Sequence, residues 1–92
     1  MNISTESKSF TLTILSAPWV YGTNNYIKIL QDSFRISIEE INIDTRPDMA
    51  DKYRITVLPT ILVEDTDKEV LRFTGFTDVS TMHKALKELG IS

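Results

Sequence analysis

Val57-Leu58-Pro59-Thr60-Ile61-Leu62-Val63-Glu64 is the stretch of sequence that decides the fold. A run of strand-forming residues follows directly after a proline, although proline lacks the N–H donor that a central strand normally uses. We therefore expect the Leu58–Pro59 bond to be cis and to turn the chain sharply into the strand, although only about 5–6% of X-Pro bonds in folded proteins are cis. The stretch predicts a strand over residues 60–64 that begins at this turn.

The chain before this stretch shows two strand-like segments separated by a helical one. Apolar residues alternate at period two over residues 10–16 and again over 36–43, where Glu39 and Glu40 interrupt the alternation and predict an irregular strand. Residues 24–34 have apolar side chains at spacings of three and four, which predicts a helix with one face on the sheet. That face consists of Tyr26, Ile27, Ile29, Leu30 and Phe34.

Two further helices are predicted from their capping residues. Pro47 suits the first turn of a short helix that ends near Tyr53, with Thr45 as its N-cap. Asp78 suits the N-cap of a last helix that runs to about Leu89 and is stopped by a glycine. The inner face of this last helix is predicted to hold Met82, Leu86 and Leu89.

The predicted order of elements is βαβαββα, because residues 60–64 and 69–74 flank a polar hairpin loop at 65–68. Two parallel strands are joined through a helix and are followed by an antiparallel hairpin. The predicted fold class is therefore α/β, with a four-stranded mixed sheet and helices on both faces.

The chain resembles the thioredoxin family from about residue 10 to the C-terminus. Besides Pro59, the resemblance rests on Ala17-Pro18-Trp19 after the first strand, Asn42-Ile43-Asp44 after the second, and Gly75, which follows the proline by sixteen residues. It implies a thioredoxin-like fold without the N-terminal strand and helix of full-length members. We assign residues 10–92 to a thioredoxin-like domain and the polar residues 1–9 to a flexible tail.

The family's redox motif is missing. Where its members carry Cys-x-x-Cys after the tryptophan, this chain has Val20-Tyr21-Gly22-Thr23, and it contains no cysteine. Val20 and Thr23 take the places of the two cysteines, and a pairing shifted by one residue gives no thiol either. Ile14 stands where the family has a buried acid that helps to move protons. Because a thiolate is the nucleophile of dithiol–disulfide exchange, that reaction is excluded.

The resemblance implies a binding role that needs no thiol. In the family, the residue before the cis-proline pairs with an extended peptide by strand addition. We expect Leu58, beside Pro59, to do the same within an apolar rim of Trp19, Tyr21 and Phe76. The first hypothesis is a non-catalytic adaptor, regulatory subunit or chaperone-like clamp that binds another protein or an extended peptide. The simpler alternative is that the proline only fixes the fold and the tryptophan covers the edge of the core.

Two other interpretations stay open. Tyr21 or Thr23 at a helix N-terminus would donate a hydrogen bond to a bound thiolate, as in glutathione transferases, which predicts a glutathione-dependent transferase or peroxidase. Against this, Thr23 would simply cap the helix, Tyr21 would be a half-exposed aromatic residue, and 92 residues leave no room for a second helical domain. The remaining interpretation is a cysteine-free variant of a thiol oxidoreductase.

Composition narrows the function further. The chain has 92 residues, 41% hydrophobic and 25% charged, which is typical of one globular domain. A net charge of −3 without a basic cluster argues against nucleic acid as a partner. We see no secretory signal and no apolar stretch near the ~18 residues of a membrane helix, so we predict a cytoplasmic protein. We predict no cofactor, and no metal site either, because His83 is the only histidine.

Overall fold

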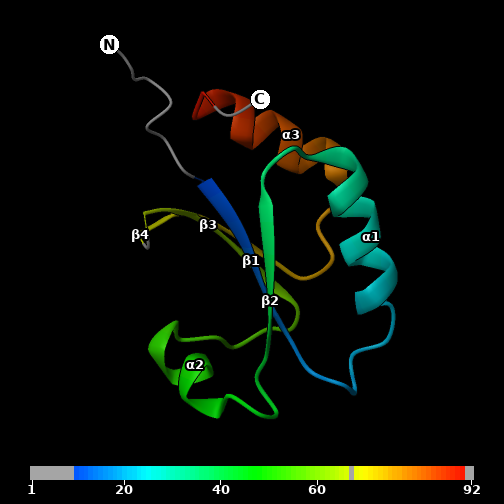
Figure 1. Cartoon of the computed structure of the whole chain (residues 1–92), viewed down its shortest axis with the longest axis vertical. Helices are drawn as coiled ribbons and strands as arrows, with labels where there is room; N and C mark the ends of the chain where they lie inside the picture. The colour runs from blue at the N-terminus through cyan, green and yellow to red at the C-terminus, as the bar shows by residue number, and fades with distance from the viewer. Residues whose placement is uncertain (1–9, 67, 91–92) are drawn as a thin grey trace.

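The structure, a computed structural model, describes residues 10–66 and 68–90 (Figure 1). Its elements confirm the predicted order and fold class. The tail predicted at residues 1–9 lies outside the described residues. Within the described part, no helix is long and apolar enough to cross a membrane. The elements are β1 (Phe10–Ser16), α1 (Thr23–Ser33), β2 (Ser37–Asn42), α2 (Pro47–Lys52), β3 (Thr60–Asp65), β4 (Lys68–Thr74) and α3 (Val79–Glu88).

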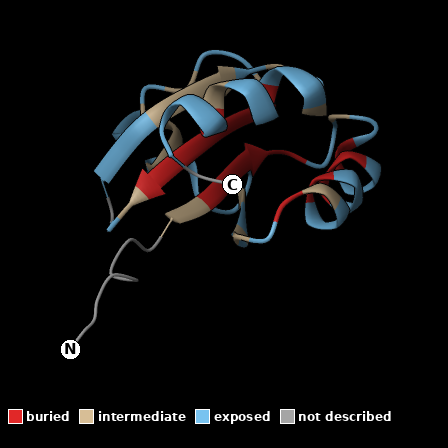
Figure 2. Cartoon of the chain, turned by 90° about the horizontal axis from the view of Figure 1, so that it is seen from above, coloured by how far each residue is buried: buried red, intermediate tan, exposed pale blue. Residues whose placement is uncertain are grey.

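The four strands form one mixed sheet in the order β2-β1-β3-β4. β1 runs parallel to β2 and antiparallel to β3, and β4 runs antiparallel to β3. β1 and β3 are therefore the central strands and most of their residues are buried, as the red segments in Figure 2 show. The parallel pair needs a crossover, which α1 supplies.

The hydrophobic core lies between one face of the sheet and helices α1 and α3, which share one side of the sheet in Figure 1. Each fully buried aliphatic side chain in it contributes about 1.5–3 kcal/mol. The predicted helical stripe is confirmed except for Ile29, which is exposed on the outer side of α1. Leu89, predicted on the inner face of the last helix, is the C-cap residue of α3 and is exposed. The core consists of Leu12, Ile14, Tyr26, Ile27, Leu30, Phe34, Ile61, Val63, Met82 and Leu86.

The prediction of an irregular second strand was wrong. β2 pairs residue by residue with β1 from Ser37 to Asn42 without a shift of register. Glu39 and Glu40 are exposed because β2 is an edge strand, where charged side chains oppose pairing with a further strand. The irregularity lies instead between β3 and β4, where the register shifts between Val63 and Glu64.

The helix caps were predicted in part. Pro47 begins α2 as expected, but the N-cap residue is Arg46, and Thr45 donates its hydroxyl hydrogen bond to the carbonyl of Asn42 instead. Asp78 does cap α3: its carboxylate accepts from the hydroxyl of Thr81 at 2.7 Å and from the N–H of the same residue at 3.1 Å. These two hydrogen bonds lower the pKa of Asp78.

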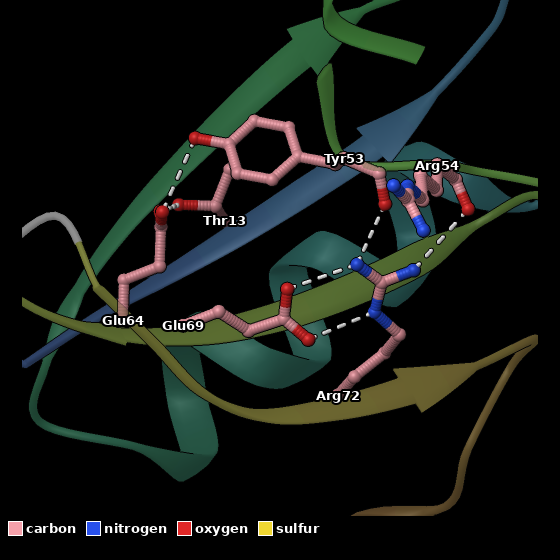
Figure 3. A network of polar contacts seen from close by, with 6 residues as sticks. All are labelled: Thr13, Tyr53, Arg54, Glu64, Glu69 and Arg72. Atoms are coloured by element: carbon pink, nitrogen blue, oxygen red, sulfur yellow. Dashed lines mark hydrogen bonds and ion pairs between the residues drawn. The ribbon is translucent and has the colours of Figure 1, made fainter. Parts of the chain in front are cut away.

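A buried carboxylate organises the opposite face of the sheet (Figure 3). Glu64 on β3 accepts a hydrogen bond from the hydroxyl of Thr13 on β1 at 2.5 Å and from the hydroxyl of Tyr53 at 3.2 Å. Tyr53 directly follows α2, so these bonds attach the end of that helix to the two central strands. The contact also explains why a glutamate can be buried here, since both its oxygens have donors.

Arg72 makes a second attachment to the same segment (Figure 3). Its guanidinium donates to the carbonyl oxygens of Tyr53, at 2.7 Å, and Arg54, at 3.4 Å. It also holds both carboxylate oxygens of Glu69 at 2.9 Å. The Glu69 pair keeps the guanidinium fixed over the backbone, and the hydrogen bonds from Arg72 lower the pKa of Glu69.

Replacing Thr13 with valine tests the buried carboxylate. Thr13→Val keeps the side-chain shape but leaves one oxygen of Glu64 buried without a donor, so we expect a loss of about 1–3 kcal/mol in the free energy of unfolding. Thr13→Val combined with Glu64→Met removes the buried carboxylate together with its Thr13 donor and leaves only the part-buried Tyr53 hydroxyl without this acceptor, so it is expected to be more stable than Thr13→Val alone. Urea unfolding followed by circular dichroism measures both. A single variant as stable as the wild type would contradict this account.

The lowered pKa of Glu69 predicts an acid-dependent loss of stability. The folded protein binds the proton of the Glu69 carboxyl less tightly than the unfolded chain does. The stability that the Glu69–Arg72 pair contributes is therefore complete above the ordinary pKa range of glutamate and is lost as the pH falls through the lowered pKa of Glu69. We expect the urea midpoint to fall between about pH 5 and pH 3, and to fall less in Glu69→Gln. Glu39→Gln, which removes an exposed carboxylate on β2 that has no ion pair among the described residues, is the matched control for the effect of Glu69→Gln.

Candidate functional site

The segments singled out by the sequence meet at one end of the sheet. The antiparallel pairing of β1 and β3 places Leu15, near the end of one strand, opposite Thr60, at the start of the other. The N–H of Gly75 donates to the carbonyl of Pro59 at 2.8 Å, which brings the chain after β4 to the same place. The start of α1 is therefore surrounded by the loops after β1, before β3 and after β4.

The backbone before β3 offers unused hydrogen-bonding groups. The Leu58–Pro59 peptide bond is cis, and the proline ring is buried. The hydroxyl of Thr60 donates to the carbonyl of Val57 at 2.5 Å and closes the turn. Within residues 10–66 and 68–90, neither the N–H nor the C=O of Leu58 has a hydrogen-bond partner. Such free backbone groups are what a strand-like peptide pairs with.

Three aromatic side chains at this end of the molecule are exposed. Trp19 is 63% exposed, Tyr21 is 96% exposed and Phe76 is 49% exposed. Because Trp19 lies mostly in solvent, its exposure favours the rim over the alternative in which it covers the edge of the core. Tyr21 is also more exposed than the half-exposed residue we expected.

Phe76 is held over the start of α1. Its ring packs edge-to-face on Tyr26, with the ring centroids 5.2 Å apart, and a Cβ on Gly22 would lie 3.9 Å from it. The Tyr26 hydroxyl donates to the carbonyl of Thr77 at 2.5 Å and so fixes the segment that carries Phe76. Burial raises the pKa of Tyr26, so the phenol stays protonated as a donor.

The positions of the missing cysteines hold no reactive group. α1 begins at Thr23, and the N-cap is Gly22 in the left-handed conformation (φ 85°), so Thr23 does not cap the helix as expected. The Thr23 hydroxyl is buried, donates to the carbonyl of Val20 at 3.1 Å and lies 2.9 Å from the hydroxyl of Ser16. Its only proton is therefore engaged and does not serve a bound thiolate, while the Tyr21 side chain extends into solvent.

A cavity of about 500 Å³, which was not predicted from the sequence, lies on the β2 side of α1. It lies between the β1–α1 loop, the first half of α1 and the end of β2, and it does not include Leu58, Pro59 or Phe76. The sign of this cavity in the sequence is a set of polar residues on the predicted first helix and the predicted second strand. Only the fold shows that these two segments lie close together. These residues are Asn24, Asn25, Lys28, Glu40 and Asn42.

Comparison with solved structures finds thioredoxins. A thioredoxin-2 described as a component of malaria parasite protein secretion machinery has a TM-score of 0.76 and 19% identity, over 88% of this chain and 84% of that chain. A Fasciola hepatica thioredoxin has a TM-score of 0.74 and 20% identity, over 90% and 84% of the two chains. A poplar thioredoxin h has a TM-score of 0.72 and 19% identity, over 91% and 78%.

No protein-family model matches the chain, and no curated protein matches it in sequence. Because the structural likenesses are below 25% identity, they establish the fold alone. The chain thus has a thioredoxin-like fold, as the sequence predicted, and it lacks the Cys-x-x-Cys motif.

The absence of cysteine predicts a negative result in an insulin-reduction assay. With dithiothreitol or thioredoxin reductase as the reductant, we expect insulin precipitation at the uncatalysed rate, since no residue can form a mixed disulfide. A thioredoxin with both cysteines serves as the positive control. A rate that rises with the concentration of this protein would contradict the non-redox interpretation.

Proposed function

We propose that the protein is a non-catalytic thioredoxin-fold protein that binds an extended segment of another protein, as an adaptor, regulatory subunit or chaperone-like clamp. The observation that carries this proposal is the unpaired backbone of Leu58 at the same end of the sheet as the exposed rings of Trp19, Tyr21 and Phe76. A cytoplasmic location, predicted from the sequence, belongs to the same proposal.

The two parts of this surface, the backbone of Leu58 and the aromatic rings, contribute to binding in different ways. Main-chain hydrogen bonds to Leu58 add the segment like a further strand and give affinity that does not depend on its side chains. The hydrogen bond between Gly75 and Pro59 keeps the neighbouring Phe76 close to that backbone. The aromatic rings then bury apolar area against the segment's side chains, and Tyr and Trp are the residues that most often carry binding energy at interfaces.

The glutathione-dependent alternative draws no support from the described residues. Its two candidate hydroxyls belong to Thr23, which is buried and engaged, and to Tyr21, which projects into solvent at the rim. A hydroxyl that stabilises a thiolate must point at the sulfur from a fixed position, and neither side chain meets this condition.

Replacing Tyr21 tests the aromatic part of the surface. With a partner captured from the source cells and then purified, we expect Tyr21→Ala to weaken binding roughly thirtyfold, which corresponds to about 2 kcal/mol at an interface hot spot. The melting temperature should change little, because the side chain is almost wholly exposed. Ile29→Ala removes an exposed apolar residue from the outer side of α1 and is the matched control. Unchanged affinity in Tyr21→Ala would place the interface elsewhere.

Hydrogen exchange tests the backbone part of the same surface. If the partner adds as a strand, the amide of Leu58 should exchange more slowly in the complex than in the free protein. The amides on the outer side of α1 are the internal reference. A tight complex that leaves the exchange of Leu58 unchanged would contradict strand addition, even if the aromatic residues contribute.

A further inference from the structure

We infer that the cavity on the β2 side of α1 is a binding site for a small zwitterion of the α-amino acid class. The cavity measures about 500 Å³. That volume lies within the range of roughly 300–1,000 Å³ that is typical of small-molecule sites. It is separate from the peptide surface of the proposed function, apart from the loop residues around Tyr21 that border both.

The two walls of the cavity, formed by α1 and β2, are polar because polar residues recur on each element at the spacing that puts them on one side. On α1, Asn24 and Lys28 are one helical turn apart and project from the same side of the helix. On β2, Glu40 and Asn42 are two residues apart and share one face of the sheet. That face is the one on which α1 packs, because Glu40 pairs in register with the core residue Ile14, and Glu40 itself is exposed beyond the edge of the helix. Helix and strand therefore present polar side chains to the same cavity.

The charges on these walls are opposite and unpaired. Lys28 lies on the helix wall and Glu40 on the strand wall, and within the described residues neither side chain takes part in an ion pair or hydrogen bond. A ligand with one charge would satisfy only one wall. A ligand with both charges satisfies both, its carboxylate toward Lys28 and its ammonium toward Glu40.

The remaining polar groups suit the same ligand. The amides of Asn24 and Asn25 make no hydrogen bond to the described residues, and each offers two donors and an acceptor. Asn42 uses its side-chain oxygen to accept from the N–H of Asp44 at 2.9 Å, which leaves its NH₂ group as a donor. Amides that donate to a carboxylate and accept from an ammonium complete a site for an amino acid with a polar side chain.

Titration of the ¹⁵N-labelled protein with L-glutamine tests this inference. We expect saturable shifts of the amide signals of Asn24, Asn25 and Glu40. L-glutaminamide lacks the carboxylate and N-acetyl-L-glutamine lacks the ammonium, so each should bind at least about tenfold more weakly, as the loss of one charged hydrogen bond predicts. Equal binding of either analogue would overturn the proposal and indicate a site for one end of a peptide chain.

Variants of the residues on the two walls distinguish specific binding in the cavity from non-specific binding of the ligand to the protein surface. Lys28→Met and Glu40→Gln should each weaken L-glutamine binding about tenfold or more. Glu39→Gln removes the neighbouring carboxylate, which points to the opposite face of β2, and should leave binding unchanged. The exchange Lys28→Glu with Glu40→Lys keeps both charges and should recover binding with the ligand reversed. No saturable shift in the wild type, or an equal loss in Glu39→Gln and Glu40→Gln, would overturn the inference.

Discussion

The antiparallel pairing of β1 with β3 is the constraint on which the rest of the structure depends. The cross-strand pair Ile14 and Ile61 faces α1 and α3, whereas Thr13 and Leu62 face the side on which the segment after α2 lies. The same register decides where the surface loops meet, because the end of β1 lies beside the start of β3. One set of backbone hydrogen bonds thus builds the core and also gathers the exposed aromatic residues around the start of α1.

β1 has a neighbouring strand on each side, so the start of α1 above it has two flanks of different chemistry. On the β3 side lie the unpaired backbone of Leu58 and the ring of Phe76. On the β2 side lies the polar cavity with Lys28 and Glu40. Between the flanks, Thr23, which stands at the second position of the family's motif, shares a hydrogen bond with Ser16. The thioredoxin-like fold is thus present without a thiol at its centre, and the two proposed binding sites lie on either side of it.

Local patterns predicted the elements well. Long-range contacts account for most of what they missed, whereas the N-cap of α2 was missed for a local reason, because Thr45 bonds to Asn42 three residues before it. Asp78 caps a helix whatever surrounds it, so its role was readable from the sequence. The burial of Glu64 was not readable, because its partner Thr13 is 51 residues away and the register shift beside it is a property of the paired strands. The exposure of Glu39 follows from the position of β2 at the sheet edge. For the same reason the cavity needed the fold, since neither α1 nor β2 alone forms it.

At this end of the molecule, the residues that contribute to folding differ from those that are proposed to bind a partner. Pro59 is buried and Thr23 has its hydroxyl engaged, so substitution of either disturbs the core before it affects any surface. Tyr21 and Trp19 bury little area in the isolated chain, and hydrophobic stabilisation scales with the area removed from water. Large aromatic rings at these positions therefore contribute little to folding. They would bury substantial apolar area only if another molecule covered them, which is the physical reason for the proposal that this surface binds a partner.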